Sequence, residues 1–493
     1  MIWSNLPALQ VVVPLLSAPL CVVLRREALS YAIAFAASWA ALVISILLLQ
    51  EVSVNGPISF ELGGWAPPWG IEYRVDSVNA YVLLIVSAIG AIVITYAQPS
   101  VAREIEQPRR YLFYTSYLLC FAGLLGVTIT GDAFNVFVFL EISSLSSYVL
   151  ISLGKDQRAL TAAYRYLIFG TIGATFYLIG VGLLYQVTGS LNIADMAERV
   201  APVTDSRTVR AAFAFMAVGI AMKAALFPLH VWLPNAYAYA PSVVTAFLAA
   251  TATKVSIYVL LRIYFTLFGP TFSVDTMSLD LLLLPLAIAA MFVGSAVAIF
   301  QPDIKRMLAY SSVAQIGYMI FGIGIATTIG LTAGILHLFN HALMKAALFL
   351  AMGCIFYRLG SVKLEAMAGV GRTMPWTMAA FVAGGLSLIG VPLTVGFISK
   401  WYLVLAAIER DWWWAVVLIL LSSLLAIIYV WRVVEAAYFQ PPSPEAEKAE
   451  EAPLAMVGSM WVLIAANVYF GLDTRISVGV AEAAANSLRG ISP

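Results

Sequence analysis

The residues that could do chemistry in this sequence are a few ionisable side chains inside long apolar segments. Lys223 lies in the middle of one such segment, and Pro228 follows five residues later. A cation at the bilayer centre costs about 3 kcal/mol on insertion scales, and a proline breaks or kinks the helix before it, here near Phe227. A charge on a broken helix is a recurring device for moving ions through membranes. This stretch therefore indicates ion translocation.

A second group of ionisable residues recurs at every fourth position. His337, His341 and Lys345 have the spacing that places side chains on one face of a helix. Histidine titrates near neutral pH and can hand protons onward. The alternative is a pair of hydrogen-bonded packing histidines, and the lysine in the same stripe argues against it. The stripe therefore predicts a proton relay.

Four further residues complete the candidate set. Lys254 is as deep in its apolar segment as Lys223, and Glu141 lies in another such segment just before a run of serines. Lys400 follows a proline in an interrupted segment, and His230 lies near the end of the Lys223 segment. Intramembrane ionisable groups are functional by default. The alternatives are a static ion pair for Glu141 and a structural role for His230.

Other charged residues have simpler interpretations. Four arginines lie near the ends of expected helices, where long side chains extend to the membrane interface, and we expect structural roles for Arg165, Arg262, Arg358 and Arg432. Asp132 is expected to be a carboxylate at the end of a loop.

Glu141 could control the proton affinity of Lys223. Burial lowers the proton affinity of an amine, and a nearby carboxylate raises it. At about 4 Å and an effective dielectric constant of about 20, the attraction is roughly 4 kcal/mol, or about a thousandfold in proton affinity. Movement of one group relative to the other would make the lysine take up or release a proton. The serines after Glu141 could hold buried water.

Composition places the chain in the membrane. Of its 493 residues, 62% are hydrophobic and 11% are charged, and the mean hydropathy is +0.93. A net charge of +1 without a basic tract argues against nucleic-acid binding. The three cysteines are far apart, so their spacing suits neither a metal site nor a disulfide framework. We therefore expect no cofactor and no metal.

Apolar segments of about 20 residues, the length that crosses a bilayer, recur from end to end. They predict an all-α polytopic membrane protein with about 14 transmembrane helices. The expected spans are residues 3–24, 29–50, 76–97, 110–130, 133–154, 161–187, 211–233, 241–268, 279–300, 305–326, 329–357, 376–408, 412–438 and 454–472. The first span lacks the leading positive charges of a cleaved signal peptide.

Two segments between spans differ in composition from the rest. Residues 60–74 mix alternating apolar residues with Gly, Pro and two tryptophans. This pattern predicts a small periplasmic β-hairpin at the membrane surface. Residues 440–451 are rich in Pro and Glu, and we expect a flexible cytoplasmic loop there.

Interrupted spans at matching places predict internal repeats. Lys223 and Pro228 lie in helix 7, and Pro392 and Lys400 lie in helix 12, five helices later. This pattern indicates two inverted five-helix repeats, helices 4–8 and 9–13, with discontinuous helices 7 and 12. The expected divisions are 1–109 for helices 1–3 with the hairpin, 110–268 and 269–438 for the repeats, and 439–493 for the loop, helix 14 and tail. An excess of Lys and Arg on one side of the alternating spans places both termini outside.

Three stretches of the sequence resemble a known group of proteins. They run from Lys223 to Tyr258, from Asp303 to Ser312 and from His337 to Phe349. They resemble the antiporter-like membrane subunits of respiratory complex I, membrane-bound hydrogenases and multisubunit monovalent-cation/proton antiporters. The resemblance implies 14 helices with inverted repeats around a central hydrophilic axis. It also implies roles for single residues: a coupling pair of Glu141 and Lys223, a relay of Lys254, His337, His341 and Lys345, and an exit-side Lys400.

Within this group the sequence looks most like the D-type subunits of the cation/proton antiporters. It lacks the long C-terminal extension of the A-type subunits, and a lysine rather than a glutamate at Lys400 argues against the M-type subunit of complex I. The D-type subunits of energy-converting hydrogenases look nearly as similar. Many family members have an aspartate and a histidine where this chain has Asn235 and Tyr237. A carboxylate and an imidazole are therefore missing from the expected cytoplasmic entrance for protons.

The leading hypothesis is a proton-translocating subunit of a multisubunit monovalent cation/proton antiporter in a bacterial or archaeal cell membrane. Its expected partners are other membrane subunits and the lipid bilayer, with protons and Na⁺ as the candidate ions. The alternative is the same machinery in a redox-driven complex, a membrane-bound hydrogenase or an NADH-quinone oxidoreductase, without a redox site of its own. A transporter of an organic solute is disfavoured because the buried polar groups are nearly all titratable. A structural scaffold would leave the cost of the buried charges unexplained.

Overall fold

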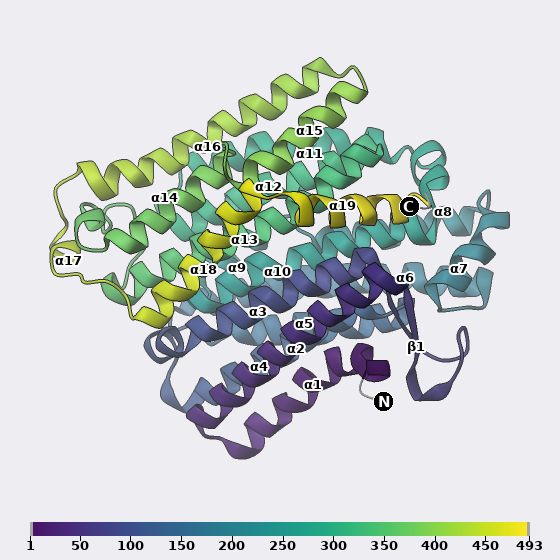
Figure 1. Ribbon diagram of the computed structural model, residues 1–493, viewed down its shortest axis with the longest axis horizontal. Helices are drawn as coiled ribbons and strands as arrows, with labels where there is room; N and C mark the ends of the chain where they lie inside the picture. Colours follow the sequence, from purple (N-terminus) through teal and green to yellow (C-terminus); the bar gives the residue numbers. More distant parts are fainter. Residues whose placement is uncertain (1–2, 491–493) are drawn as a thin grey trace.

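The computed structural model describes residues 3–490, which form a bundle of long helices (Figure 1). Twelve helices in this range are long and apolar enough to cross a membrane. They are α1 (Leu6–Leu24), α2 (Glu27–Asn55), α3 (Ser77–Glu104), α4 (Arg110–Ile129), α5 (Ala133–Ser152), α6 (Gln157–Thr188), α10 (Ser242–Leu261), α11 (Leu279–Ile299), α12 (Ile304–Ile325), α13 (Thr328–Leu359), α16 (Trp413–Phe439) and α18 (Leu454–Leu472).

Two further passes are made by pairs of shorter helices. The pair α8 (Arg207–Lys223) and α9 (Leu233–Tyr239) takes the place of predicted helix 7, and α14 (Pro375–Ile389) and α15 (Val395–Glu409) take the place of helix 12. The prediction of about 14 passes with two discontinuous helices is therefore confirmed. One detail was wrong, because Lys223 was expected more than ten residues from a helix end. It is the last residue of α8, and the break begins before Phe227.

The predicted hairpin is present between α2 and α3. Strands β1 (Ile58–Glu61) and β2 (Glu72–Val75) pair antiparallel. The tryptophans of the connecting loop, Trp65 and Trp69, are exposed. Figure 1 shows both labelled chain ends on the side of the bundle where this hairpin lies. We call this side the hairpin face and the other side the opposite face.

The inverted repeats are marked by two matching backbone pairings. Before α5, the N–H of Ala133 donates to Leu191 O and the N–H of Ile193 donates to Gly131 O, at 2.8 Å each. Before α12, the N–H of Ile304 donates to Val362 O at 3.0 Å, and residue 364 donates to residue 302 in the same way. Each pairing joins the residues just before one long helix to the residues that follow the next long helix. Because each repeat has five passes, the first pairing lies on the hairpin face and the second on the opposite face.

Several elements were not predicted. They are α7 (Ile193–Val200), the wider helical turn Phe272–Thr276, the short α17 (Pro444–Glu447), and α19 (Arg475–Leu488), which follows the last span. A second wider turn, Arg262–Leu267, continues α10 to the end of the predicted span 241–268. Residues 440–451 were expected to be flexible, yet Ser443 donates to Ala366 O and Glu451 accepts from the N–H of Trp376. These contacts hold the segment against the bundle. The divisions at residues 109, 268 and 438 stay a prediction.

Candidate functional site

The first repeat brings Lys223 and Glu141 together at the end of a half-helix. Lys223 Nζ lies 3.4 Å from Glu141 Oε1 and donates to Ser144 Oγ at 2.6 Å. The lysine side chain is 3% exposed, whereas the glutamate side chain is 24% exposed. Glu141 and Ser144 are close because both are on α5, three residues apart. This buried lysine therefore has an acidic partner that reaches the lateral surface of the chain.

Aromatic packing closes the break after α8. The last carbonyls of a helix lack partners within the helix, and the indole N–H of Trp232 donates to Met222 O at 3.0 Å. The Trp232 ring stacks on Tyr166 with centroids 3.9 Å apart. Gly170 of α6 fits here because a Cβ would lie 1.9 Å from the Tyr148 hydroxyl. The sequence therefore positions the end of α8 with side chains from α5, α6 and the break itself.

Lys254 is fully buried in α10. Its amine donates to the carbonyl of Ala249 and, at 3.3 Å, to the hydroxyl of Thr253. A small cavity extends from Lys223 to the helix that carries Lys254, because its lining includes Lys223, Ser144 and, from α10, Ser256. This cavity has room for about one water molecule. It provides a polar step from the α8 break toward α10.

The histidine stripe on α13 lies inside the second repeat. His337 Nε2 is 2.9 Å from Gln315 Oε1, and its Nδ1 is 2.8 Å from Ser399 Oγ. The His341 ring is nearly parallel to that of His337, with centroids 6.1 Å apart. Neither nitrogen of His341 has a hydrogen-bond partner among the described residues. The two imidazoles thus lie one turn apart on the same face of α13, and His337 contacts α15 through Ser399.

Lys345 ends the same stripe and is also fully buried. Its amine donates to Leu308 O at 2.7 Å and to the hydroxyl of Ser311, both on α12. The predicted stripe of two histidines and a lysine therefore lies on a single face of α13, and its hydrogen-bond partners are on α12 and α15.

Lys400 of α15 reaches back to the end of α14. Its amine donates to Leu388 O at 3.1 Å and to Ile389 O at 2.8 Å, carbonyls that the helix leaves free. It also lies 4.8 Å from the centre of the Tyr318 ring. Gly390 has a φ of +94°, and a Cβ there would meet Lys400 Cδ at 2.9 Å. The glycine is therefore required by both its backbone and the passing lysine.

The predicted set is not joined completely. His230 lies in the break after Lys223, stacks on Phe227, and leaves Nδ1 without a partner among the described residues. It makes no hydrogen bond to another candidate residue in the part of the chain that the structure describes. Tyr237, at the expected cytoplasmic entrance for protons, is buried and donates to Leu248 O at 3.3 Å. The tyrosine is thus held in place by packing and by this hydrogen bond.

Sequence reasoning missed two polar residues of the site. Gln315 and Ser399 flank His337 on both ring nitrogens. A signal existed for Gln315, because a glutamine inside the apolar span α12 needs a hydrogen-bond partner. Ser399 precedes Lys400 and gave no signal of its own.

The charges of the site are unevenly balanced. Across residues 3–490, Lys223 is the one central lysine within ion-pair distance of a carboxylate. The three others donate to carbonyl and hydroxyl oxygens, and these are Lys254, Lys345 and Lys400. No group of His, Cys, Asp and Glu in the described residues is arranged to hold a metal ion. The candidate residues therefore form a row of buried titratable groups that extends through both repeats.

Comparison with known proteins agrees with this geometry. The family described as NADH:quinone oxidoreductase/Mrp antiporter, TM, matches residues 130–426, more than half of the chain. The chain belongs to this family. The matched region runs from the loop before α5 into α16 and contains all eight candidate residues of this antiporter-like chain.

Relatives come from two kinds of complex. The N subunit of NADH-quinone oxidoreductase from Desulforudis audaxviator is 44% identical over 456 residues, covering 91% of this chain and 90% of that protein. The D subunit of the Na⁺/H⁺ antiporter from Alkalihalophilus pseudofirmus is 33% identical over 411 residues, covering 83% and 82%. A chain in the Mrp complex from Dietzia sp. superposes with a TM-score of 0.90 at 28% identity, covering 99% and 98%. The chain is therefore an antiporter-like, multi-pass membrane subunit.

Proposed function

We propose that this chain is the proton-translocating subunit of a multisubunit monovalent cation/proton antiporter. The observation that carries the proposal is the Lys223–Glu141 pair at a helix break inside the membrane, 3.4 Å apart. A change in this distance changes the proton affinity of the lysine. The pair can therefore couple a movement or charge at the surface of α5 to a proton inside the chain.

The other candidate residues have roles along one axis. Lys254 receives a proton from Lys223 within the first repeat, because the small cavity beside Lys223 reaches the helix that carries Lys254. His341 and His337 pass the proton toward Ser399 and Lys400, with Lys345 setting the charge at one end. Lys400, at the second break, serves as the exit-side residue. His230 is a peripheral member whose role rests on its position beside the first break.

The position of Glu141 supports assembly with another membrane subunit. It lies within an outward-facing apolar stripe of α5 that includes Phe134, Leu145 and Val149, all of them exposed. A carboxylate that is 24% exposed at this depth would face lipid in an isolated chain, and charges facing lipid are costly. A neighbouring subunit on this stripe would remove that cost and could place its own charge beside Glu141.

Proton flux in vesicles tests the proposal. The assembled complex is reconstituted in proteoliposomes with a fluorescent pH indicator inside and a sodium gradient across the membrane. Glu141→Gln should stop the cation-linked pH change while the complex still assembles. The matched control is Glu447→Gln on α17, far along the chain from the central axis, which should retain full flux. Full flux with Glu141→Gln would refute the role of the pair.

A second function is favoured by one observation. The 44% identical relative is named as a subunit of NADH-quinone oxidoreductase. The same axis in such a complex would be driven by redox chemistry in other subunits. Affinity purification of the tagged chain separates the two: several small membrane subunits support the antiporter, and iron–sulfur or nickel subunits support the redox complex.

We also propose that the hairpin face is the outer face of a bacterial or archaeal membrane. The proposal rests on the excess of Lys and Arg in the loops of the opposite face. It places both termini outside. Alkaline phosphatase fused after residue 493 should be active. If the enzyme is active only when it is inserted within residues 440–451, the hairpin face is the inner face.

A further inference from the structure

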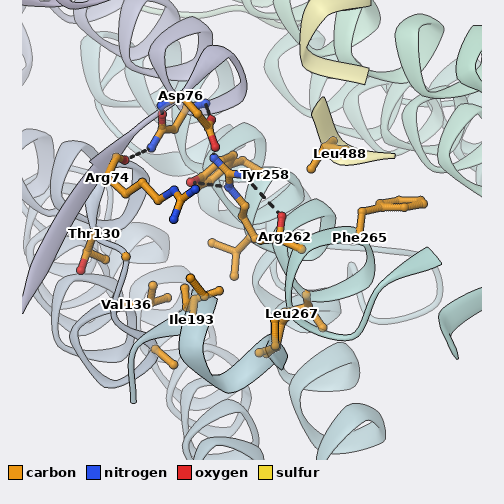
Figure 2. Close-up of a pocket in the computed structure, with 18 of the residues that line it drawn as sticks. Arg74, Asp76, Thr130, Val136, Ile193, Tyr258, Arg262, Phe265, Leu267 and Leu488 are labelled. Atoms are coloured by element: carbon orange, nitrogen blue, oxygen red, sulfur yellow. Dashed lines mark hydrogen bonds and ion pairs between the residues drawn. The ribbon is translucent and has the colours of Figure 1, made fainter. Parts of the chain in front are cut away.

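A cavity of about 400 Å³ opens on the hairpin face, apart from the proton axis (Figure 2). This volume is within the range of small-molecule sites in proteins. Its lining comes from β2, the loop before α3, the start of α5, α7 and the end of α10, together with the end of α19. Elements far apart in the sequence therefore build one pocket.

One side of the pocket is an ordered polar cluster. Arg262 Nη2 lies 2.6 Å from Asp76 Oδ1, and Arg262 Nε donates to the Tyr258 hydroxyl at 3.0 Å. Asp76 also accepts from the N–H groups of Val78 and Asn79 at the start of α3. Burial opposes ionisation of Asp76, but Arg262 and these N–H groups outweigh it and keep the pKa of Asp76 below its usual value. Arg262 and Asp76 are therefore a satisfied, neutral pair.

The second carboxylate of the lining is also occupied. Glu72 is 4% exposed and accepts from Ser59 Oγ at 2.6 Å and from Asn192 Nδ2 at 2.8 Å. The guanidinium of Arg74 is different, because no described residue accepts a hydrogen bond from it. Figure 2 shows this guanidinium extending into the pocket beside Tyr258 and Arg262. Arg489 also lines the pocket and donates to one neutral group, the Thr328 hydroxyl, at 3.3 Å.

The other side of the pocket is apolar. Figure 2 places Val136, Ile193 and Leu267 across from the arginines. The lining also includes Met216 of α8 and Ile263 of the turn that continues α10, both parts of membrane passes. With three arginines against two carboxylates that already have partners, the pocket has an excess of positive charge at one end and an apolar surface at the other.

We propose that this pocket binds the phosphate headgroup of an anionic phospholipid, with the start of an acyl chain along the apolar side. Arginine matches a phosphate because its planar donors form two parallel, charge-assisted hydrogen bonds. The free guanidinium of Arg74 would supply them, and Arg489 would add a second cation. A lipid is favoured over a free anion by the adjoining apolar wall and by the exposed Trp65 and Trp69 on the same face, residues that are typical of membrane interfaces.

Native mass spectrometry of the full-length chain tests the proposal. The protein is purified in neutral detergent, stripped of lipid and titrated with phosphatidylglycerol, with phosphatidylcholine and with inorganic phosphate in separate arms. We expect one phosphatidylglycerol to stay bound per chain and to bind at least about tenfold more tightly than phosphatidylcholine, since hydrogen bonds to charged groups contribute about 1.5–3 kcal/mol. Arg74→Gln should lose this preference, and Arg74→Lys should keep part of it.

The matched control is Arg199→Gln. Arg199 lies on α7 on the same face, is exposed and pairs with Asp195 at 2.9 Å, but does not line the pocket. It should leave the lipid preference unchanged. Equal binding of both lipids, or an unchanged preference in Arg74→Gln, would overturn the proposal. If inorganic phosphate binds as tightly as phosphatidylglycerol, the pocket is a site for a free anion instead. Loss of bound lipid when the chain joins its partner subunits would assign it to a protein contact.

Discussion

The two repeats place a lysine at a helix break in opposite chemical settings. Lys223 ends α8 and faces the carboxylate of Glu141, while the Met222 carbonyl at the helix end accepts from Trp232 and from the N–H of Ala225. Lys400 enters from the second half-helix and takes the free carbonyls of α14 itself. Both amines thus lie at the C-terminal end of a half-helix, where the helix dipole favours a cation.

The difference shows how one scaffold can give two lysines unlike tasks. A full negative charge that can move stabilises the cation at Lys223 strongly and in a controllable way. Fixed carbonyl dipoles at Lys400 offer a weaker and constant attraction. The first repeat is therefore suited to drive a proton, and the second is suited to accept it and let it go.

The largest expected effect comes from removing each lysine. Lys223→Ala or Glu141→Ala should abolish proton movement in both directions, because the driving pair is lost. Lys400→Ala should slow proton release more than uptake, because the earlier groups of the axis remain. Fluxes measured in proteoliposomes with pH gradients of either sign distinguish the two. If Lys400→Ala reduces proton uptake and proton release equally, the exit-side role of Lys400 is wrong.

A smaller difference is expected in stability. Lys223→Met leaves Glu141 without its cation, whereas Lys400→Met leaves two carbonyls without a donor. Removing one partner of a buried pair costs about 3–5 kcal/mol, and the partial exposure of Glu141 reduces this to roughly 1–2 kcal/mol by solvent screening. Lys223→Met should lower the melting temperature more than Lys400→Met. The double variant Lys223→Met with Glu141→Gln should regain part of the lost melting temperature. If the effects of the two substitutions on stability simply add, Lys223 and Glu141 are not coupled.

The glycine at the second break should have a local effect. Gly390→Ala places a Cβ at a φ of +94° and 2.9 Å from Lys400 Cδ. A left-handed backbone costs other residues about 1–2 kcal/mol, and the displaced amine should reduce proton flux severalfold. Gly458→Ala in α18 is the control, because a Cβ there meets nothing within 4 Å. A normal flux with Gly390→Ala would show that the position of Lys400 at the carbonyls is not needed.

The smallest effect concerns the matching aspartates before α5 and α12. Asp132 and Asp303 cap these helices by accepting from the N–H groups of Asn135 and Arg306. Burial raises the pKa of both carboxyls, so the ionised form is the disfavoured one. Asparagine keeps the cap without the charge.

Each Asp→Asn variant should therefore gain a few tenths of a kcal/mol at pH 7. The gain should shrink as the pH falls through the raised pKa of the folded carboxyl, and it should vanish below the unfolded value of about 3.9, where the aspartate is neutral in both the folded and the unfolded state. Each Asp→Ala variant should lose about 1 kcal/mol. Thermal unfolding at pH 7 and at pH 5 measures both. A gain that grows at lower pH would contradict the assigned direction.

The sequence was sufficient for the features that carry an energetic penalty. Lysines in apolar segments, prolines within spans and the Gly- and Pro-rich hairpin all break a local rule, so Lys223, Lys400 and residues 60–74 could be recognised. The end of α8 at Lys223 could not be placed, because the proline that signals the break lies five residues later. Propensity locates a break, but packing such as the Trp232 contact decides where the helix stops.

Features that are formed by several segments far apart in the sequence left no recognisable local sequence pattern. The pairings of residues 131–133 with 191–193 and of 302–304 with 362–364 involve too few residues for strand periodicity. The pocket on the hairpin face depends on side chains from ten helices, strands and helical turns between β2 and α19. Gln315 and Ser399 are neutral, so their presence in a span carries less penalty than a charge. These parts depend on the folded arrangement.

The two short backbone pairings have a mechanical consequence. Each closes the open end of a long two-helix hairpin with backbone hydrogen bonds, and the two closed ends lie on opposite faces. The turns of the two hairpins, at residues 153–156 and 326–327, therefore face opposite sides of the membrane as well. A partner that contacts one turn would thus act on one repeat from one side of the membrane, and a partner at the other turn would act on the second repeat from the opposite side.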